Sequence, residues 1–275
     1  MSPIDTPDTL RLADHPTARN AAVATRKLTI GSVILSEPVL TSVLFSDKTG
    51  RRCDYCHRSD ETEPELKIRR CTGCGVQWYC GERCMPDPPL SAHILTSRRF
   101  TGQKLHWDSN HRLICKAHLE FIMSETYAAL SDDQMMDSRV LSQLVAKIAL
   151  QRPEHAESIL TFESLLPSPN RLEAPPVVPM RRADPSLLSQ VPALFQRFPN
   201  NNHVMQIHLR AIGVAILPLT SRLLNHSCSP NAVLRYILSA SQKPRAEVVA
   251  IREITEGEEV RSPRLSTIKI IIFYQ

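Results

Sequence analysis

The sequence predicts a mixed α+β fold, in which a β-rich domain is interrupted by a metal-binding module and a helical segment. Three observations support this prediction. Short stretches rich in β-branched residues occur before residue 46 and again after residue 200. Seven of the 8 cysteines lie between Cys53 and Cys115. Apolar residues at helical spacing fill much of region 116–149. The two outer β parts are therefore expected to form one domain around the insertions.

Residues 22–45 are expected to form short strands. Thr29, Ile30 and Val33 favour extended backbone, and Gly31 and Pro38 interrupt it. The first β part therefore ends just before the cysteine-rich region.

Four closely spaced pairs of metal-ligand residues follow: Cys53 and Cys56, Cys71 and Cys74, Cys80 and Cys84, and His111 and Cys115. Each pair places two donors on one turn, so both can reach an ion at a Zn–S distance of roughly 2.3 Å. Without a recognisable export signal, such clustering favours thiolates over disulfides. The pairs therefore predict two closed tetrahedral Zn²⁺ sites with a structural role. His93 and His106 are rival ligands, and the helical spacing to Cys115 favours His111.

The order of these pairs, with Trp78 and Tyr79 before Cys80 and Trp107 before the last pair, resembles the MYND zinc finger. The resemblance implies that the pairs interleave. One ion is then held by Cys53, Cys56, Cys80 and Cys84, and the other by Cys71, Cys74, His111 and Cys115. This chain departs from the family at residues 85–102, a proline-containing insert that is either a tolerated loop or translated non-coding sequence.

The middle of the chain is expected to be helical and then irregular. Leu141, Leu144 and Ile148 recur at helical spacing behind Asp137 and Ser138, which are candidate helix caps. Residues 165–185 are rich in proline and predict a surface linker. A short helix over 186–197 is expected next, and a buried strand over 247–254 leads to a turn at 256–259.

A second motif is the string Asn225-His226-Ser227-Cys228-Ser229-Pro230-Asn231. Taken alone, it is typical of a polar turn. However, it also resembles the pseudoknot motif of SET domains. Residues 24–35, 211–218 and 254–260 resemble the strands and closing segment around that motif.

Together these features resemble the SET-MYND family of protein lysine methyltransferases. The implied organisation is an N-terminal SET part (18–50), a finger (53–115), a helical insert and linker (116–199), a C-terminal SET part (200–260) and a divergent tail (261–275). The resemblance implies S-adenosylmethionine as cofactor and a protein lysine as acceptor. It also implies cofactor contacts from Asn225, the backbone of His226 and Asn201.

Three departures from the family bear on activity. Residues 17–22 contain no glycine where a glycine-rich cofactor loop is expected, and His203 replaces an aromatic residue. After Val260 the expected tyrosine-bearing strand and cysteine-bearing closing segment are absent, and Tyr274 is wrongly spaced to replace that tyrosine. The SET end is therefore expected to be truncated or divergent, no catalytic residue is assigned, and weak or absent methyl transfer is predicted. Cys228, left without partners, is expected to be a small buried thiol.

The competing hypothesis is a non-catalytic, zinc-dependent interaction protein whose finger binds a peptide. Nucleic-acid binding is disfavoured because the net charge is only +5 and the basic cluster is small: Arg51, Arg52, Arg69 and Arg70. Residues 1–14 carry no apolar signal region, and no apolar run reaches membrane-spanning length. A cytoplasmic or nuclear location is therefore expected.

Overall fold

The computed structural model describes residues 7–80, 106–170, 172–180, 183–198, 201–208, 210–240 and 242–263. Several features predicted above lie outside these residues: Cys84, the 85–102 insert, His93 and the tail from residue 264, including Tyr274. In the described part, the fold is mixed α+β. No helix there combines the length and apolar character needed to cross a membrane.

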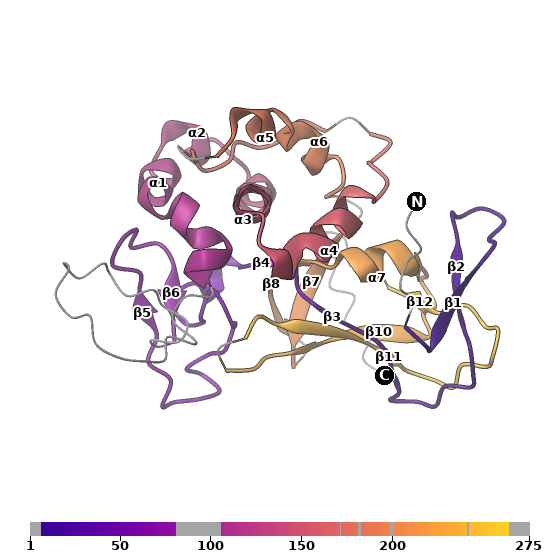
Figure 1. The fold of residues 1–275 in the computed structure, drawn as a ribbon. Helices are drawn as coiled ribbons and strands as arrows, with labels where there is room; N and C mark the ends of the chain where they lie inside the picture. Colours follow the sequence, from indigo (N-terminus) through magenta and orange to yellow (C-terminus); the bar gives the residue numbers. More distant parts are fainter. Residues whose placement is uncertain are drawn as a thin grey trace.

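Strands from the two ends of the chain form the β part (Figure 1). One sheet has the order β10 (Ala232–Ile237), β11 (Arg245–Ala250) and β3 (Val33–Pro38). A second has the order β4 (Thr41–Leu44), β8 (Arg210–Ile216) and β7 (Asn202–Ile207). A hairpin joins β1 (Leu10–Ala13) to β2 (Ala21–Ala24), and β9 (Asn225–His226) pairs in parallel with β12 (Arg261–Ser262). The N-terminal strands β3 and β4 thus pair with strands that follow residue 200.

Local sequence explains where these strands begin, end and approach one another. Pro38 ends β3 because it has no N–H to donate to a partner strand. Gly213 allows β8 to lie close to β4, since a Cβ there would lie 2.1 Å from the carbonyl oxygen of Val43. Leu35 and Val248 are buried where β3 meets β11, in a core shared by both ends of the chain.

Six helices lie on one side of the strands in Figure 1: α1 (Arg112–Ile122), α2 (Glu125–Ala128), α3 (Asp132–Leu150), α4 (Pro153–Glu163), α5 (Pro185–Ser189) and α6 (Val191–Phe195). Leu141, Leu144 and Val145 of α3 are fully buried at the centre of this layer. Each buried side chain of this size stabilises the fold by about 1.5–3 kcal/mol.

The start of α3 differs from the prediction. The helix begins at Asp132, because Ser131 and Gln134 form a reciprocal capping box. Asp137 and Ser138 therefore lie inside the helix and do not cap it. The hydroxyl of Ser138 instead donates to the carbonyl oxygen of Pro176 at 2.6 Å.

The proline-rich segment is likewise more than a surface linker. Val178 and Met180 are buried in the core around α3, and the N–H of Val178 donates to Ser142 Oγ at 2.9 Å. The single helix expected over 186–197 is divided into α5 and α6, with Pro192 in the first turn of the second.

The cysteine-rich module lies at the end of the molecule opposite the β1–β2 hairpin (Figure 1). It contains η1 (Ser46–Lys48), β5 (Arg69–Arg70) paired with β6 (Trp78–Tyr79), and η2 (Trp107–His111), a π-helical turn that leads into α1. The side chain of His57 joins this module to β4, with 2.7 Å between His57 Nε2 and Ser42 Oγ.

Candidate functional site: two metal-ligand clusters and the Asn225 motif

The structure brings Cys71, Cys74, His111 and Cys115 together in one buried cluster. Cys71 Sγ lies 3.3 Å from His111 Nε2 and 3.8 Å from Cys115 Sγ, and Cys74 Sγ lies 3.7 Å from His111 Nε2. Donor atoms around a tetrahedral zinc ion are expected about 3.5–3.8 Å apart for Zn–S of roughly 2.3 Å and Zn–N of roughly 2.0 Å. These donors therefore fit a closed tetrahedral zinc site.

The turn between the first two of these cysteines has little spare room. A Cβ at Gly73 would lie 2.8 Å from Cys115 Sγ and 3.8 Å from Cys71 Sγ. Gly75 adopts a φ of 64°, which glycine tolerates at little cost. The two glycines thus let the turn fold closely around the cluster.

A second cluster contains Cys53, Cys56 and Cys80, with 3.5 Å between the sulfurs of Cys56 and Cys80. Cys84, predicted as the fourth donor, lies outside the described residues. The rival ligand His106 is in neither cluster. Its Nδ1 lies 2.8 Å from the hydroxyl of Tyr79, and its ring stacks on that of His111.

The backbone around the second cluster is shaped by two buried side chains that sequence reasoning had not singled out. Asp54 Oδ2 accepts from the N–H of Trp78 at 2.7 Å, and burial raises the pKa of Asp54 to about 6. His57 has a left-handed backbone with a φ of 59°. Burial lowers the pKa of His57 to about 4, so a neutral imidazole contacts Ser42 of β4. Both residues stand next to predicted cysteine ligands, which is the only sequence signal for them.

The Asn225 motif lies at the other end of the molecule, where three segments meet. Asn225 Nδ2 donates to the carbonyl oxygen of Asn20 at 2.7 Å and to Glu259 Oε1 at 2.8 Å. In the parallel pairing of β9 and β12, Arg261 lies opposite Asn225 and Ser262 opposite His226. The side chain of Asn225 thus joins the N-terminal segment to the segment that follows the 256–259 turn. We call this junction of three segments the Asn225 crossing.

Asn231, at the end of the motif, is fully buried and also stabilises the Asn225 crossing, because it hydrogen-bonds the backbone of residues 259 and 261. Its Nδ2 donates to the carbonyl oxygen of Glu259 at 2.8 Å, and its Oδ1 accepts from the N–H of Arg261 at 2.8 Å. Its Nδ2 also lies 3.2 Å from Glu258 Oε1. The pKa of Glu258 is lowered to about 2, chiefly by its hydrogen bond with Arg252.

The glycine-free loop at 17–22 is stabilised by hydrogen bonds that were not predicted from the sequence. His15 Nδ1 accepts from the N–H groups of Thr17 at 3.1 Å and Ala18 at 2.8 Å, which closes the β1–β2 connection. On its other side, His15 Nε2 lies 3.9 Å from Glu259 Oε2. His15, two residues before the loop, thus stabilises the loop, and no local sequence motif identifies it.

Glu37 positions the helix that leads into the motif. It is buried on β3, where it accepts from the N–H of Thr220 at 2.6 Å and of Leu219 at 3.2 Å. Burial raises the pKa of Glu37, and the hydrogen bonds from these amides oppose that shift. These amides belong to the first turn of α7 (Pro218–Leu223), so β3 fixes the start of this helix. An acid within an apolar strand is the signal that could have identified Glu37.

The other predicted site residues have different environments. Asn201 is buried, and its side chain donates to the carbonyl oxygen of Arg197. His203 Nε2 lies 2.9 Å from the hydroxyl of Ser221 in α7. The expectation that Cys228 is a buried thiol is wrong: it is exposed, with its sulfur 3.5 Å from His226 Nε2, because the motif loop faces solvent there.

Comparison with known proteins identifies the family of this chain. The model of the SET domain matches residues 21–261. N-lysine methyltransferase SMYD2-B of Xenopus laevis is 25% identical over 256 residues, covering 92% of this chain and 54% of the relative. Histone-lysine N-methyltransferase ASHR1 of Arabidopsis thaliana is 23% identical, covering 94% and 50%. Histone-lysine N-methyltransferase SMYD3 of Homo sapiens is 24% identical, covering 91% and 54%.

The chain spans about half the length of these curated relatives. The solved SET domain of LSMT bound to lysine and AdoHcy covers 95% of this chain and 50% of that chain, at 11% identity. Its TM-score of 0.33 is too low to bear on the site. The SET match includes the Asn225 crossing and most of the strands of both ends, and two cysteine clusters consistent with a MYND finger lie within it. This chain therefore belongs to the SET-domain family and is related to the SET and MYND (SMYD) lysine methyltransferases.

Proposed function

We propose that this chain binds S-adenosylmethionine where the loop after His15, the Asn225–His226 strand and residues 259–261 meet, and that its reaction is the methylation of protein lysines, at the weak or absent level predicted above. The observation that carries the proposal is the set of hydrogen bonds from Asn225 to Asn20 and Glu259. They hold the motif residue at the junction of three segments within the SET match. The relatives named as lysine methyltransferases support the same reaction class.

In this proposal the cofactor, when bound, supplies the methyl group of a sulfonium. Asn225 and Glu259 offer oxygen acceptors for its ammonium end, and the backbone of His226 faces its adenine. Asn201 is retained as a further cofactor contact. Glu37 is a positioning residue, because it sets the start of α7 and so the direction from which the chain reaches Asn225. The protein must also align a neutral lysine amine and exclude water.

We further propose that both metal-ligand clusters hold Zn²⁺. Cys71, Cys74, His111 and Cys115 supply four donors and leave no open position, so this ion is structural. Cys84 is proposed as the fourth ligand beside Cys53, Cys56 and Cys80. Zinc at these sites would stabilise the finger and, through His57 and Ser42, its contact with β4.

Calorimetric titration with S-adenosylmethionine tests the cofactor proposal. Asn225→Ala should weaken binding by about tenfold or more, because the crossing and a polar contact are both lost. Ser229→Ala is the matched control, since Ser229 is an exposed residue of the same motif loop. Equal affinity in the parent and Asn225→Ala would contradict the proposal. Transfer of a radiolabelled methyl group to histones or bulk protein then tests the reaction.

The alternative is a non-catalytic module whose finger binds a peptide. The exposed edge of the finger favours it, because the guanidinium carbon of Arg70 lies 4.7 Å from the ring centroid of Trp78, beside exposed Arg69. A chain that retains two zinc ions but binds no S-adenosylmethionine would support this alternative.

A further inference from the structure

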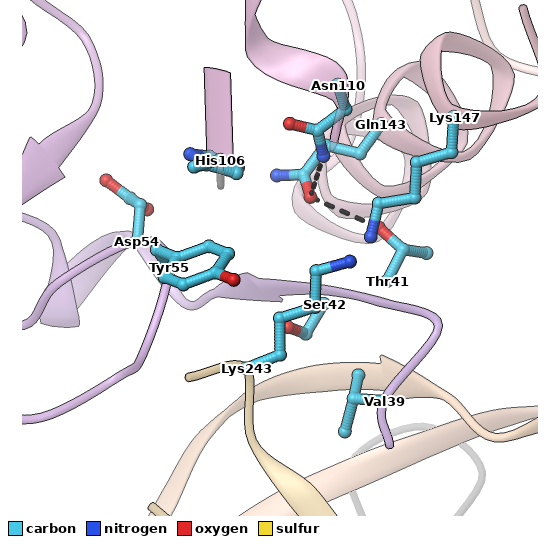
Figure 2. Close-up of a pocket in the computed structure, with 10 residues that line it drawn as sticks. All are labelled: Val39, Thr41, Ser42, Asp54, Tyr55, His106, Asn110, Gln143, Lys147 and Lys243. Atoms are coloured by element: carbon cyan, nitrogen blue, oxygen red, sulfur yellow. Dashed lines mark hydrogen bonds between the residues drawn. The ribbon is translucent and has the colours of Figure 1, made fainter. Parts of the chain in front are cut away.

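The polar side chains of the pocket between the finger, α3 and β4 hydrogen-bond one another (Figure 2). Gln143 Oε1 accepts from Thr41 Oγ1 at 3.1 Å and from Asn110 Nδ2 at 3.3 Å. The side-chain amine of Lys147 donates to the carbonyl oxygen of Leu40. These contacts join three parts of the chain, so the pocket has a structural role. A second polar junction, next to the Asn225 crossing, bears on ligand binding.

This junction is formed by the β1–β2 connection, residues 14–20, which contains no glycine. The structure describes all of these residues, and none of them has a positive φ. The connection therefore turns without the backbone conformations that favour glycine. Backbone N–H groups in such a turn need a partner. His15 provides it, because its Nδ1 accepts from the N–H groups of Thr17 at 3.1 Å and Ala18 at 2.8 Å.

These two contacts determine which ring nitrogen of His15 carries the proton. Two N–H donors directed at Nδ1 require a lone pair there, so the proton of the neutral ring is on Nε2. His15 Nε2 lies 3.9 Å from Glu259 Oε2. The two nitrogens thus contact different segments: Nδ1 contacts the β1–β2 connection, and Nε2 faces the segment that follows the 256–259 turn.

The contacts continue through the Asn225 crossing and return to the same connection. Glu259 Oε1 accepts from Asn225 Nδ2 at 2.8 Å, and Asn225 Nδ2 also donates to the carbonyl oxygen of Asn20 at 2.7 Å. His15 and Asn20, near the two ends of the connection, are therefore both held near Glu259. Between them, the amides of Thr17 and Ala18 are held by His15 Nδ1.

We propose that His15 is a positioning residue for S-adenosylmethionine binding. By accepting from Thr17 and Ala18, it holds the β1–β2 connection in the conformation that binds the cofactor, at the place where a glycine-rich loop is expected. This inference rests on the proposed function. Without the acceptor, the connection samples other conformations, and binding must first order it. The apparent affinity then falls in proportion to the fraction of molecules in the binding conformation.

Two substitutions at this position separate the roles of the two ring nitrogens. In His15→Asn, Oδ1 takes the place of Nδ1, and asparagine commonly accepts from the N–H groups of the residues that follow it. In His15→Gln, the side-chain amide nitrogen takes the place of Nε2 near Glu259, and the acceptor close to the backbone is lost.

Calorimetric titration with S-adenosylmethionine measures the effect. We expect His15→Asn to bind within about threefold of the parent. His15→Gln should bind about tenfold more weakly, as follows if roughly one molecule in ten keeps the ordered connection. His15→Asn is the matched control, because it removes the same ring and keeps only the acceptor.

The outcomes separate this inference from the proposed function. Equal affinity in the parent and His15→Gln, with weaker binding by Asn225→Ala, would overturn the role of His15 and leave the proposed function standing. Equal weakening in His15→Asn and His15→Gln would also overturn it, because the Nδ1 acceptor would then not be the cause. A parent that binds no S-adenosylmethionine would overturn both.

Nuclear magnetic resonance of the unmodified chain provides a test that needs no variant. Correlation spectra of the imidazole nitrogens show which nitrogen of the neutral ring carries the proton. We expect the proton on Nε2 of His15 and slowed hydrogen exchange at the amides of Thr17 and Ala18. A neutral ring with its proton on Nδ1 could accept from neither amide and would overturn the inference, whatever the cofactor affinity.

Discussion

Asn231→Ala should destabilise the SET part of the molecule by about 3 kcal/mol. The buried amide satisfies the N–H of Arg261 and the carbonyl oxygen of Glu259, each at 2.8 Å. Alanine leaves both backbone groups without that partner, and each such loss costs about 1–3 kcal/mol. The finger is expected to be unaffected, because none of these contacts reaches it.

The two tryptophans allow the two parts to be followed separately. Trp78 and Trp107 both lie in the finger, so urea unfolding followed by tryptophan fluorescence reports on that module. Far-UV circular dichroism reports on the whole chain. At fixed excess zinc, Asn231→Ala should lower the dichroism midpoint and leave the fluorescence midpoint unchanged. Ser229→Ala, at an exposed position of the same loop, should change stability by less than about 0.5 kcal/mol. A dichroism shift for Asn231→Ala no larger than this control would refute the reasoning.

Two further predictions concern the metal clusters and a buried acid. Purified protein should contain two zinc ions per chain. Cys71→Ser should lose one zinc ion and unfold the finger. Cys228→Ser should retain both ions, because Cys228 is exposed and belongs to neither cluster. Metal analysis that gives one ion for the parent, or two for Cys71→Ser, would contradict this. Burial and the nearby Asp133 raise the pKa of Asp137 from 3.8 to about 6. A raised carboxyl pKa penalises folding above pH 6, and the penalty fades as the pH falls toward 3.8. Asp137→Asn should therefore increase the free energy of unfolding by about 1–2 kcal/mol at pH 7.5 and by little at pH 4. An equal gain at both pH values in urea titrations would show that protonation is not the cause.

Features that depend on neighbouring residues could be predicted from the sequence. The mixed α+β character and the relation to the SET-MYND family are confirmed. The donors of the Cys71–Cys74 pair stand on a single turn, and the Asn225 motif is one uninterrupted string. The apolar spacing of Leu141 and Leu144 likewise reflects the period of one helix, and both residues are buried in α3. Short-range geometry restricts such patterns, so they can be recognised without knowing what they contact.

Contacts between distant segments could not be predicted from the sequence, because they depend on how the whole chain folds. Cys71 meets His111 across 40 positions, and Asn225 meets Asn20 across 205. His15 closes the glycine-free loop, and no sequence pattern distinguishes it from other surface histidines. The burial of Val178 against α3, and of Lys147 against the carbonyl oxygen of Leu40, depends on how the layers pack. A residue's partners and burial are set by the whole chain, because the free energy of a buried polar or apolar group depends on what surrounds it.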